Sequence, residues 1–565
     1  MKIKNTIPAL VLGLLSYSNF SLASNQALQA PQFNNLGSFH HEISTKVPLA
    51  QHFFDQGLVL FYGFEWGESI RSFKEATRLD PHCGMCYWGL ALALGNIINA
   101  PLTGHEYRDA QSAIQQALSL KPYETAAEQD YIKALSLRFQ HAPKISNKVG
   151  AFSCHTSTNS QDESTPNEII SYTNAMKKVS EKYPTDYDAK ALYTYTLFKQ
   201  ISWRFWDAHG KINPLTPIII KMLKSIIDKD QSNIGGNHYY IHVIEQSPRP
   251  EQALDSANRL KTLVPGSEHL VHMPVHIYFL TGRYHQGTAS NLQAIEAFNE
   301  YNKTCYTQGF KPEINYLYLH NYDFLRTTAI MEGRKALALS AADQMINKPF
   351  PEWLAKEPTL QWFIPIPYFA KARFGLWKEL LNEPMPRSDY QYALGMWHYA
   401  RGMALAHTGE IKGAEKELVS LKKIRLKGET ESNLGKQGHN LLRISNEILA
   451  ATISNFQKNE RLTLAHLKLA EKIQYDMGYH EPPDWYLPVK EILGDAYLKW
   501  GHPNEAIVMY EQDLKQYPKN GWALYGLAQA LQEQKKNSEA NQAEQQFKEA
   551  WKYADIPIPI NIFKN

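Results

Sequence analysis

Histidine and acidic residues recur at short helical intervals in the middle of the chain. Two histidines four residues apart lie one turn apart on a single helix face, so His238 with His242 and His272 with His276 could each bind a metal ion as a pair. Imidazole together with one or two carboxylates suits zinc, copper or non-haem iron far better than calcium or magnesium. We therefore predict a transition-metal site whose candidate ligands are His238, His242, Glu245, His269, His272, His276, His320 and Asp323.

A repeated pattern of aromatic, apolar and small residues predicts the helices that must position these side chains. Residues 53–81 and 494–518 follow the spacing of the tetratricopeptide repeat, and residues 402–418 give a weaker copy. One helix pair of this kind leaves an apolar face exposed, so the pairs must stack. The chain has 565 residues and is 44% apolar, which is enough to build a long core. We predict an all-α fold, a right-handed superhelical α-solenoid of tetratricopeptide-type helix pairs, with little or no sheet.

The repeat also predicts where the histidines lie. Ala253 and Pro265 are twelve residues apart, as repeat positions 20 and 32 require. Counting from these anchors, and from Gly333 for the last block, places the candidate ligands at positions 2, 5, 9 and 12. In tetratricopeptide solenoids these positions belong to the first helix of each pair, on the face turned into the groove. We therefore expect the histidines to line one wall of that groove.

The candidate ligands are more numerous than one tetrahedral ion needs. Either a two-metal site forms, or some of the histidines are hydrogen-bond partners of the residues that bind the metal. Two alternatives without metal remain open, namely a buried polar network and a groove that binds an acidic peptide.

Cys83 and Cys86 form a C-x-x-C motif at the start of a predicted helix. Tyr87 follows in place of a histidine, so the motif for covalent haem attachment is absent. We expect a local disulfide. The alternative is a redox-active or metal-binding pair, because a helix N-terminus lowers the pKa of a thiol. Cys154 and Cys305 could form a second bridge.

The first residues have the features of an export signal. Lys2 and Lys4 precede an apolar stretch, and Ala23 ends a plausible cleavage site. No later apolar run is long enough to span a membrane. We expect an exported protein, periplasmic or secreted, with this organisation: signal peptide 1–23, linker 24–46, N-terminal repeats 47–140, polar loop 141–168, central repeats with the histidines 169–347, a Pro- and Trp-rich joint 348–389, C-terminal repeats 390–556, and a tail 557–565.

Several blocks of the chain resemble those of a family of exported bacterial tetratricopeptide proteins. They are Cys83-Gly-Met-Cys-Tyr-Trp-Gly89, His238-Tyr-Tyr-Ile-His242, His269-Leu-Val-His272-Met-Pro-Val-His276-Ile-Tyr278, Met331-Glu-Gly-Arg334, Glu481-Pro-Pro-Asp-Trp485-Tyr486 and Asn520-Gly-Trp-Ala-Leu524. The resemblance covers most of the mature chain and implies the fold and export, but no settled activity. The family often has a second histidine where this chain has Asp323. Aspartate also binds metals, and the difference bears on which metal is bound.

Three classes of function follow from these observations. The first is an exported scaffold whose groove binds a peptide or protein, with a transition-metal site as its distinctive feature. The second is a metal-dependent enzyme, oxidative or hydrolytic, with Glu245 as ligand or general base. The third is a peptide-binding scaffold without metal. A net charge of +3 with no basic stripe argues against a nucleic-acid partner.

Overall fold

The computed structural model describes residues 28–95, 104–140, 167–207, 210–313, 317–347, 349–424 and 434–558. Over these residues the regular structure is helical, apart from an isolated antiparallel bridge between Trp206 and Ile212. The prediction of an all-α solenoid is confirmed. None of the described helices is long and apolar enough to cross a membrane. The predicted signal peptide, and the polar loop up to residue 166, lie outside the described residues.

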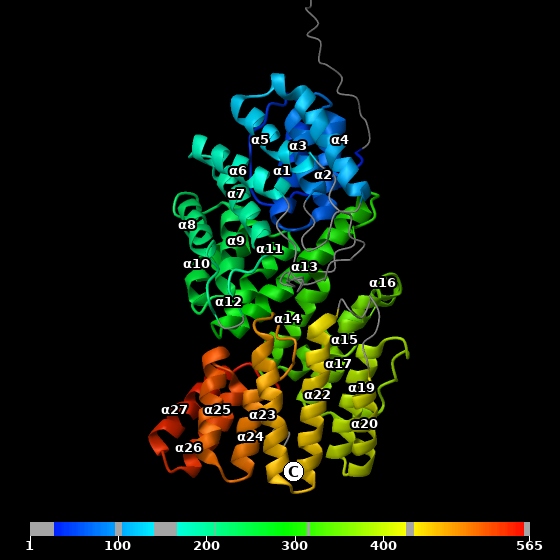
Figure 1. Ribbon diagram of the computed structural model, residues 1–565, viewed down its shortest axis with the longest axis vertical. Helices are drawn as coiled ribbons and strands as arrows, with labels where there is room; N and C mark the ends of the chain where they lie inside the picture. Colours follow the sequence, from blue (N-terminus) through cyan, green and yellow to red (C-terminus); the bar gives the residue numbers. More distant parts are fainter. Residues whose placement is uncertain are drawn as a thin grey trace, which may run out of the picture.

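Successive helices pack on one another along the chain, in the order shown in Figure 1. The N-terminal helices are α1 (Pro48–Tyr62), α2 (Trp66–Leu79), α3 (Gly84–Leu94), α4 (Gly104–Leu120), α5 (Ala126–Ser136), α6 (Asn167–Lys182) and α7 (Tyr187–Gln200), with short 3-10 turns at Lys121–Tyr123 and Leu137–Phe139. The central helices are α8 (Thr216–Ile227), α9 (Ile234–Glu245), α10 (Leu254–Leu263) after a 3-10 turn at Pro250–Ala253, α11 (Glu268–His272), α12 (Pro274–Leu280), α13 (Tyr284–Thr307), α14 (Leu317–Met331) and α15 (Lys335–Ile346).

The Pro- and Trp-rich joint consists of short helices. They are α16 (Phe350–Lys356), a 3-10 helix at Pro358–Phe363, α17 (Ile366–Arg373) and α18 (Trp377–Leu381). Regular pairs then resume with α19 (Gln391–His407), α20 (Ile411–Lys423), α22 (Gly435–Phe456), α23 (Glu460–Met477), α24 (Val489–Lys499), α25 (Pro503–Gln516), α26 (Gly521–Glu533) and α27 (Asn537–Ala550).

An aromatic residue of each strong repeat packs closely against a glycine of the helix that follows the repeat. A Cβ atom on Gly89 would lie 2.3 Å from the ring of Phe73, and a Cβ atom on Gly526 would lie 2.3 Å from the ring of Tyr510. In both places the aromatic side chain of one helix fills the space that the glycine of the next helix leaves free. Glycine is thus required for the close approach of neighbouring helices.

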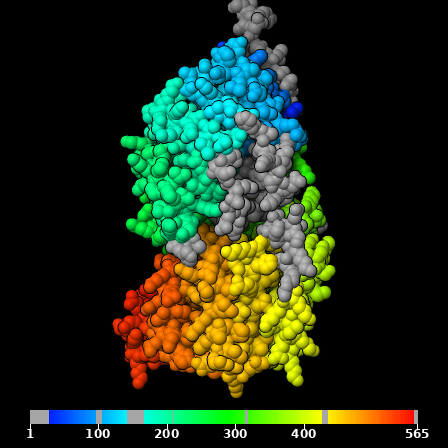
Figure 2. Space-filling model, in the orientation of Figure 1, coloured from blue at the N-terminus to red at the C-terminus, as the bar shows by residue number. Residues whose placement is uncertain are grey.

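The C-terminal helices fold back onto the centre of the chain (Figure 1). The indole N–H of Trp522 donates a hydrogen bond to the carbonyl of Ile330 (2.8 Å), and Trp522 packs in one apolar cluster with residues of α14 and α15 and with Phe374, which follows α17. The carboxylate of Asp555 accepts hydrogen bonds from the backbone N–H groups of Lys335 and Ala336 at 2.6 and 2.8 Å. On the face shown in Figure 2 the C-terminal repeats, coloured yellow to red, lie directly beneath the upper part of the molecule.

Residues 28–46, which we expected to form a linker, pack closely against the N-terminal and central helices. Phe33 and Ile43 are buried, and the side-chain amide of Gln308 accepts a hydrogen bond from the backbone N–H of Gln32 and donates one to its backbone carbonyl, both at 2.8 Å. The imidazole Nδ1 of His41 lies 2.9 Å from the carboxylate of Asp188. This segment is therefore better described as a strap than as a linker, because apolar burial and side-chain hydrogen bonds hold it in place.

The His41–Asp188 contact should make the stability of the strap depend on pH. Burial lowers the pKa of His41, but the hydrogen bond and charge of Asp188, with smaller contributions from other carboxylates, outweigh burial and raise the pKa to about 9. A raised pKa means that the contact stabilises the fold fully below the usual value of 6.5, and that this stabilisation is lost as the pH rises through 9. At about pH 6 we expect His41→Gln to lower the free energy of unfolding by about 3 kcal/mol.

Urea unfolding of the parent and of His41→Gln, measured at several values between about pH 6 and pH 10, checks this prediction. The difference between the two proteins should shrink as the pH rises. A difference that stays constant over the whole range would contradict the assigned role of His41.

Candidate metal centre

Four central helices carry the candidate ligands. His238, His242 and Glu245 lie on α9, which begins where the side chain of Asn233 accepts a hydrogen bond from the N–H of Gly236 (2.7 Å). His269 and His272 lie on α11, His276 on α12, and His320 and Asp323 on α14. Pro274 separates α11 from α12, because it lacks the N–H that would continue the helical hydrogen bonding.

The histidines do not line an open groove, so that expectation was wrong. His238, His242, His269, His272 and His276 are 0% exposed, and His320 is 6% exposed. Other parts of the chain cover this face: the turn between α1 and α2, the helix α13, and the connection between α23 and α24. In Figure 1 this last connection runs up to the level of α14. The histidines therefore form an interior cluster between packed helices.

The first three-histidine set consists of His238, His242 and His269. One ring nitrogen from each residue lies within 4.8 Å of the other two. The ring of Phe64 covers the set, with its centroid 4.5 Å from that of His238, 5.6 Å from His242 and 5.4 Å from His269. Phe64 occupies the turn between α1 and α2 with φ +58°, a conformation that disfavours L-residues. The turn keeps this backbone conformation, and the Phe64 ring packs against the three imidazoles.

The second three-histidine set consists of His272, His276 and His320, and it repeats the arrangement of the first. Again one ring nitrogen from each lies within 4.8 Å of the others. The ring of Phe324 covers this set as the ring of Phe64 covers the first. Its centroid lies 4.7 to 5.0 Å from the three imidazole centroids. Each set thus combines two histidines one helical turn apart, one histidine from another helix, and a phenylalanine.

Oxygen atoms contact the outward-facing nitrogens of three of the histidines. Nδ1 of His238 donates to the carbonyl oxygen of Tyr62 (2.6 Å), and Nδ1 of His272 donates to Oδ1 of Asn291 (2.8 Å). Nδ1 of His242 lies 3.0 Å from a carboxylate oxygen of Glu245. The oxygen atoms of Tyr62 and Asn291 can only accept, so Nδ1 of His238 and Nδ1 of His272 carry protons, and the Nε2 lone pairs of these two rings point into the cluster. Metal-binding histidines are usually oriented in this way.

His276 has the strongest acidic surroundings in the cluster. Its Nδ1 lies 2.5 Å from Oε2 of Glu481 and 2.9 Å from Oε2 of Glu245. Glu245 therefore links the two sets, because its other carboxylate oxygen contacts His242. Burial raises the pKa of Glu245 to about 8, although the neighbouring His276 lowers it. A cation in the cluster would stabilise the ionised form of this buried carboxyl group.

The inward-facing nitrogens lie too close for imidazoles that carry no proton or cation between them. Nε2 of His272 and Nε2 of His276 are 3.1 Å apart. Nδ1 of His272 donates to Asn291, so its Nε2 carries a lone pair, and either a proton on Nε2 of His276 or a cation bound by both nitrogens fits between them. Two nitrogens bound to one tetrahedral ion at 2.0–2.1 Å would be about 3.3 Å apart. The separation is therefore close to that of two ligands of one metal ion.

The first set contains buried polar atoms that lack hydrogen bonds. In this set, both ring nitrogens of His269 and Nε2 of His238 have no hydrogen-bond partner among the described residues. Burial lowers the pKa of His238 to about 3, against the effect of the Tyr62 carbonyl, and lowers that of His269 well below its usual value. Both rings are therefore neutral at ordinary pH. Leaving such buried groups unsatisfied costs about 1–3 kcal/mol each, and neutral imidazole is the form that binds metals.

Asp323 lies outside both sets. Its carboxylate pairs with the guanidinium of Arg326 at 2.7 Å, one turn along α14. Four residues that the histidine pattern did not indicate belong to the site as well: Phe64, Phe324, Asn291 and Glu481. Glu481 comes from a block that supported the family resemblance, but 205 residues separate it from His276.

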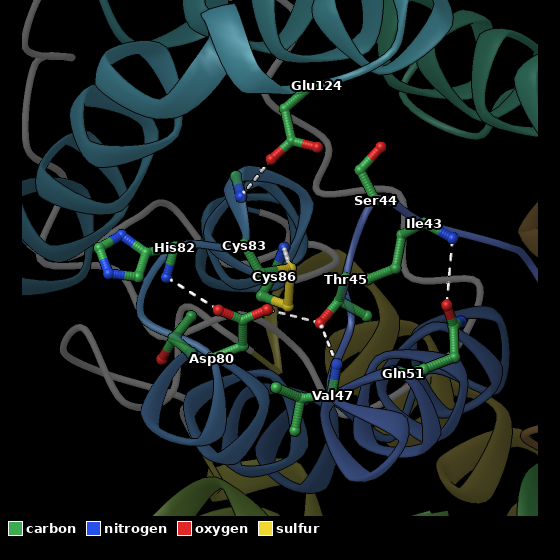
Figure 3. Close-up of a disulfide and its surroundings, with 12 residues drawn as sticks. Ile43, Ser44, Thr45, Val47, Gln51, Asp80, His82, Cys83, Cys86 and Glu124 are labelled. Carbon is green, nitrogen blue, oxygen red and sulfur yellow. Dashed lines mark hydrogen bonds between the residues drawn. A yellow bond between two sulfur atoms is a disulfide. The ribbon is translucent and has the colours of Figure 1, made fainter.

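The C-x-x-C pair lies far from the cluster in the sequence and forms a local disulfide at the start of α3 (Figure 3). Both cysteines are at most 1% exposed, and the N–H of Cys86 donates to Sγ of Cys83 (3.0 Å). The carboxylate of Glu124 accepts a hydrogen bond from the N–H of Gly84 (2.5 Å) at the same helix terminus. Burial shields the disulfide from attack by other thiols. Cys305 has a free, buried thiol, and Cys154 lies outside the described residues.

The helices of this chain define its class, an all-α solenoid of tetratricopeptide-type helix pairs. No protein-family model matches the chain, and no curated protein matches it by sequence. Solved structures with a similar architecture include human IFIT1 in a dimer with m7Gppp-AAAA, 11% identical over 89% of this chain and 90% of that one, with a TM-score of 0.30. Yeast Tom70 is 12% identical over 89% of this chain and 97% of its own, with a TM-score of 0.26. These similarities are too distant to bear on activity.

Proposed function

We propose that this protein is an exported tetratricopeptide-type solenoid that holds two transition-metal ions in its buried histidine cluster. Each three-histidine set binds one ion through three imidazole nitrogens. The observation that carries the proposal is the 3.1 Å separation between Nε2 of His272 and Nε2 of His276, which is close to the spacing of two nitrogen ligands of one ion. The unsatisfied nitrogens of His238 and His269 support the same interpretation for the first set.

The ligand atoms of the cluster determine which metal ions it can bind. Imidazole nitrogen is a good ligand for zinc, copper and iron and a poor one for calcium and magnesium. Three histidines leave one coordination position free in a tetrahedral site. Beside the second set, Glu245 and Glu481 lie on the far side of the His276 ring, where they hold its orientation. A divalent cation bound in this set would in turn stabilise the ionised forms of both carboxyl groups.

Burial of the histidines bears on the other two classes of function. A peptide in the solenoid groove would not contact these side chains, so they are unsuited to reading a peptide sequence. A metal-dependent enzyme stays a second candidate, because both sets leave a coordination position for a small reactant. The full enclosure of the cluster favours a role in which the metals are held or stored.

Metal content tests the proposal. The full-length protein should be produced with its own N-terminal residues and without a polyhistidine tag, then dialysed and subjected to elemental analysis. We expect two equivalents of zinc, copper or iron per chain. A folded protein that binds none of these metals, even after incubation with each, would overturn the proposal. N-terminal sequencing of protein recovered outside the cytoplasm tests export, and we expect cleavage near Ala23.

A further inference from the structure

A hollow lies beside the second histidine set. It encloses about 580 Å³, part of it open to solvent. Its walls come from the end of α12, from the connection between α23 and α24, and from the end of α25. The residues of these walls that matter for the argument are Phe279, His480, Glu481, Asp484, Gln516 and Tyr517.

Glu481 joins this hollow to the metal cluster. It forms part of the wall of the hollow, and its Oε2 atom lies 2.5 Å from Nδ1 of His276. Its side chain is only 1% exposed, and this one residue both lines the hollow and contacts the second histidine set. A small ion that reaches the inner wall of the hollow therefore meets Glu481 first and His276 next.

The charges around the hollow favour a cation. Glu481 and Asp484 contribute carboxylates, and His480 contributes an imidazole 3.5 Å from Asp484. Among the described residues that line the hollow, none is lysine or arginine. A wall that bears carboxylates and no fixed positive charge raises the local concentration of cations and repels anions. Oxygen ligands also exchange readily with the water molecules of a hydrated metal ion.

We propose that the hollow is the route by which a hydrated divalent transition-metal ion reaches the cluster, with Glu481 as the first protein ligand that it meets. This inference rests on the proposed metal centre. The second set, which contains His276, fills before the first, because it adjoins the hollow. Asp484 attracts the ion to the mouth, and Gln516, which is exposed on the rim, controls the width of the opening.

Metal exchange kinetics test this route. Metal is removed from the purified full-length protein by a chelator, retention of helicity is checked by circular dichroism, and Co²⁺ is added while its absorption is followed in a stopped-flow instrument. Gln516→Trp should narrow the rim and slow loading at least about tenfold, with two equivalents still bound at equilibrium. Asp484→Asn should slow loading several-fold at low ionic strength, with the difference vanishing in high salt.

A matched control separates this effect from a general effect of tryptophan. Gln532 is exposed on α26 and does not line the hollow, so Gln532→Trp should load at the parental rate. If Gln516→Trp loads as fast as the parent while the parent binds two equivalents, the route is wrong and the metal centre stands. If the parent itself binds no Co²⁺, both the metal centre and the route fail.

Discussion

A protein carrying both His238→Ala and His272→Ala should lose its metal almost completely. Each substitution reduces one three-histidine set to two imidazoles, and the remaining ligands no longer surround the ion. Loss of a mere hydrogen-bond partner of a metal ligand costs 10–100-fold in affinity, so loss of a ligand should cost at least about a hundredfold. The measurement is metal per chain by elemental analysis after dialysis.

The single variants sharpen the test. His238→Ala should retain one equivalent and His272→Ala should retain one, because the two sets bind separate ions. His285→Ala is the matched control, since His285 is a half-exposed histidine that pairs with Glu332 at 2.9 Å, outside the cluster. Retention of both equivalents in the double variant would show that the ligand set is wrong. Loss of helicity in the double variant without metal loss in either single variant would assign the histidines a structural role.

Arg373→Met should destabilise the closure between the C-terminal repeats and the centre of the chain by about 3–5 kcal/mol. The guanidinium of Arg373 forms two hydrogen bonds with the carboxylate of Glu491, at 2.7 and 3.0 Å, and both side chains are at most 4% exposed. Its Cζ atom also lies 3.6 Å from the ring centroid of Trp522. Removal of the cation leaves a buried carboxylate close to Asp513, whose pKa is already raised to about 8 by burial and by Glu491.

Urea unfolding followed by tryptophan fluorescence measures this loss. Because repeat proteins unfold in parts, a separate early transition of the C-terminal helices is the expected form of the result. The paired variant Arg373→Met with Glu491→Met should recover most of the stability, since it removes both buried charges. A loss below about 1 kcal/mol for Arg373→Met alone would contradict a structural role for this ion pair.

Local sequence patterns were sufficient to predict the helices and the pairing of the histidines. The spacing from Ala253 to Pro265 set the register, and the structure places His238 with His242 and His272 with His276 in the same sets. The i, i+4 geometry of a helix determines such pairs without reference to distant residues. The prediction of a C-x-x-C disulfide depended in the same way on residues that are close in the sequence.

Burial of the cluster depended on contacts that no local pattern contains. The repeat positions predicted an exposed groove wall, but the turn with Phe64, the helix with Asn291 and the connection with Glu481 close that face. Glu481 lies 205 residues from His276, and only the folding back of the C-terminal helices brings the two together. Asp323 was predicted as a ligand from its repeat position, whereas the neighbouring Arg326 engages its carboxylate.

Anomalous diffraction at the absorption edge of the bound metal tests the central claim most directly. Crystals of the untagged full-length protein should give two peaks per chain, one among His238, His242 and His269 and one among His272, His276 and His320. Each metal should lie about 2.0–2.1 Å from the Nε2 atoms of its set. The absence of peaks from both sets in a protein that elemental analysis shows to contain metal would contradict the account.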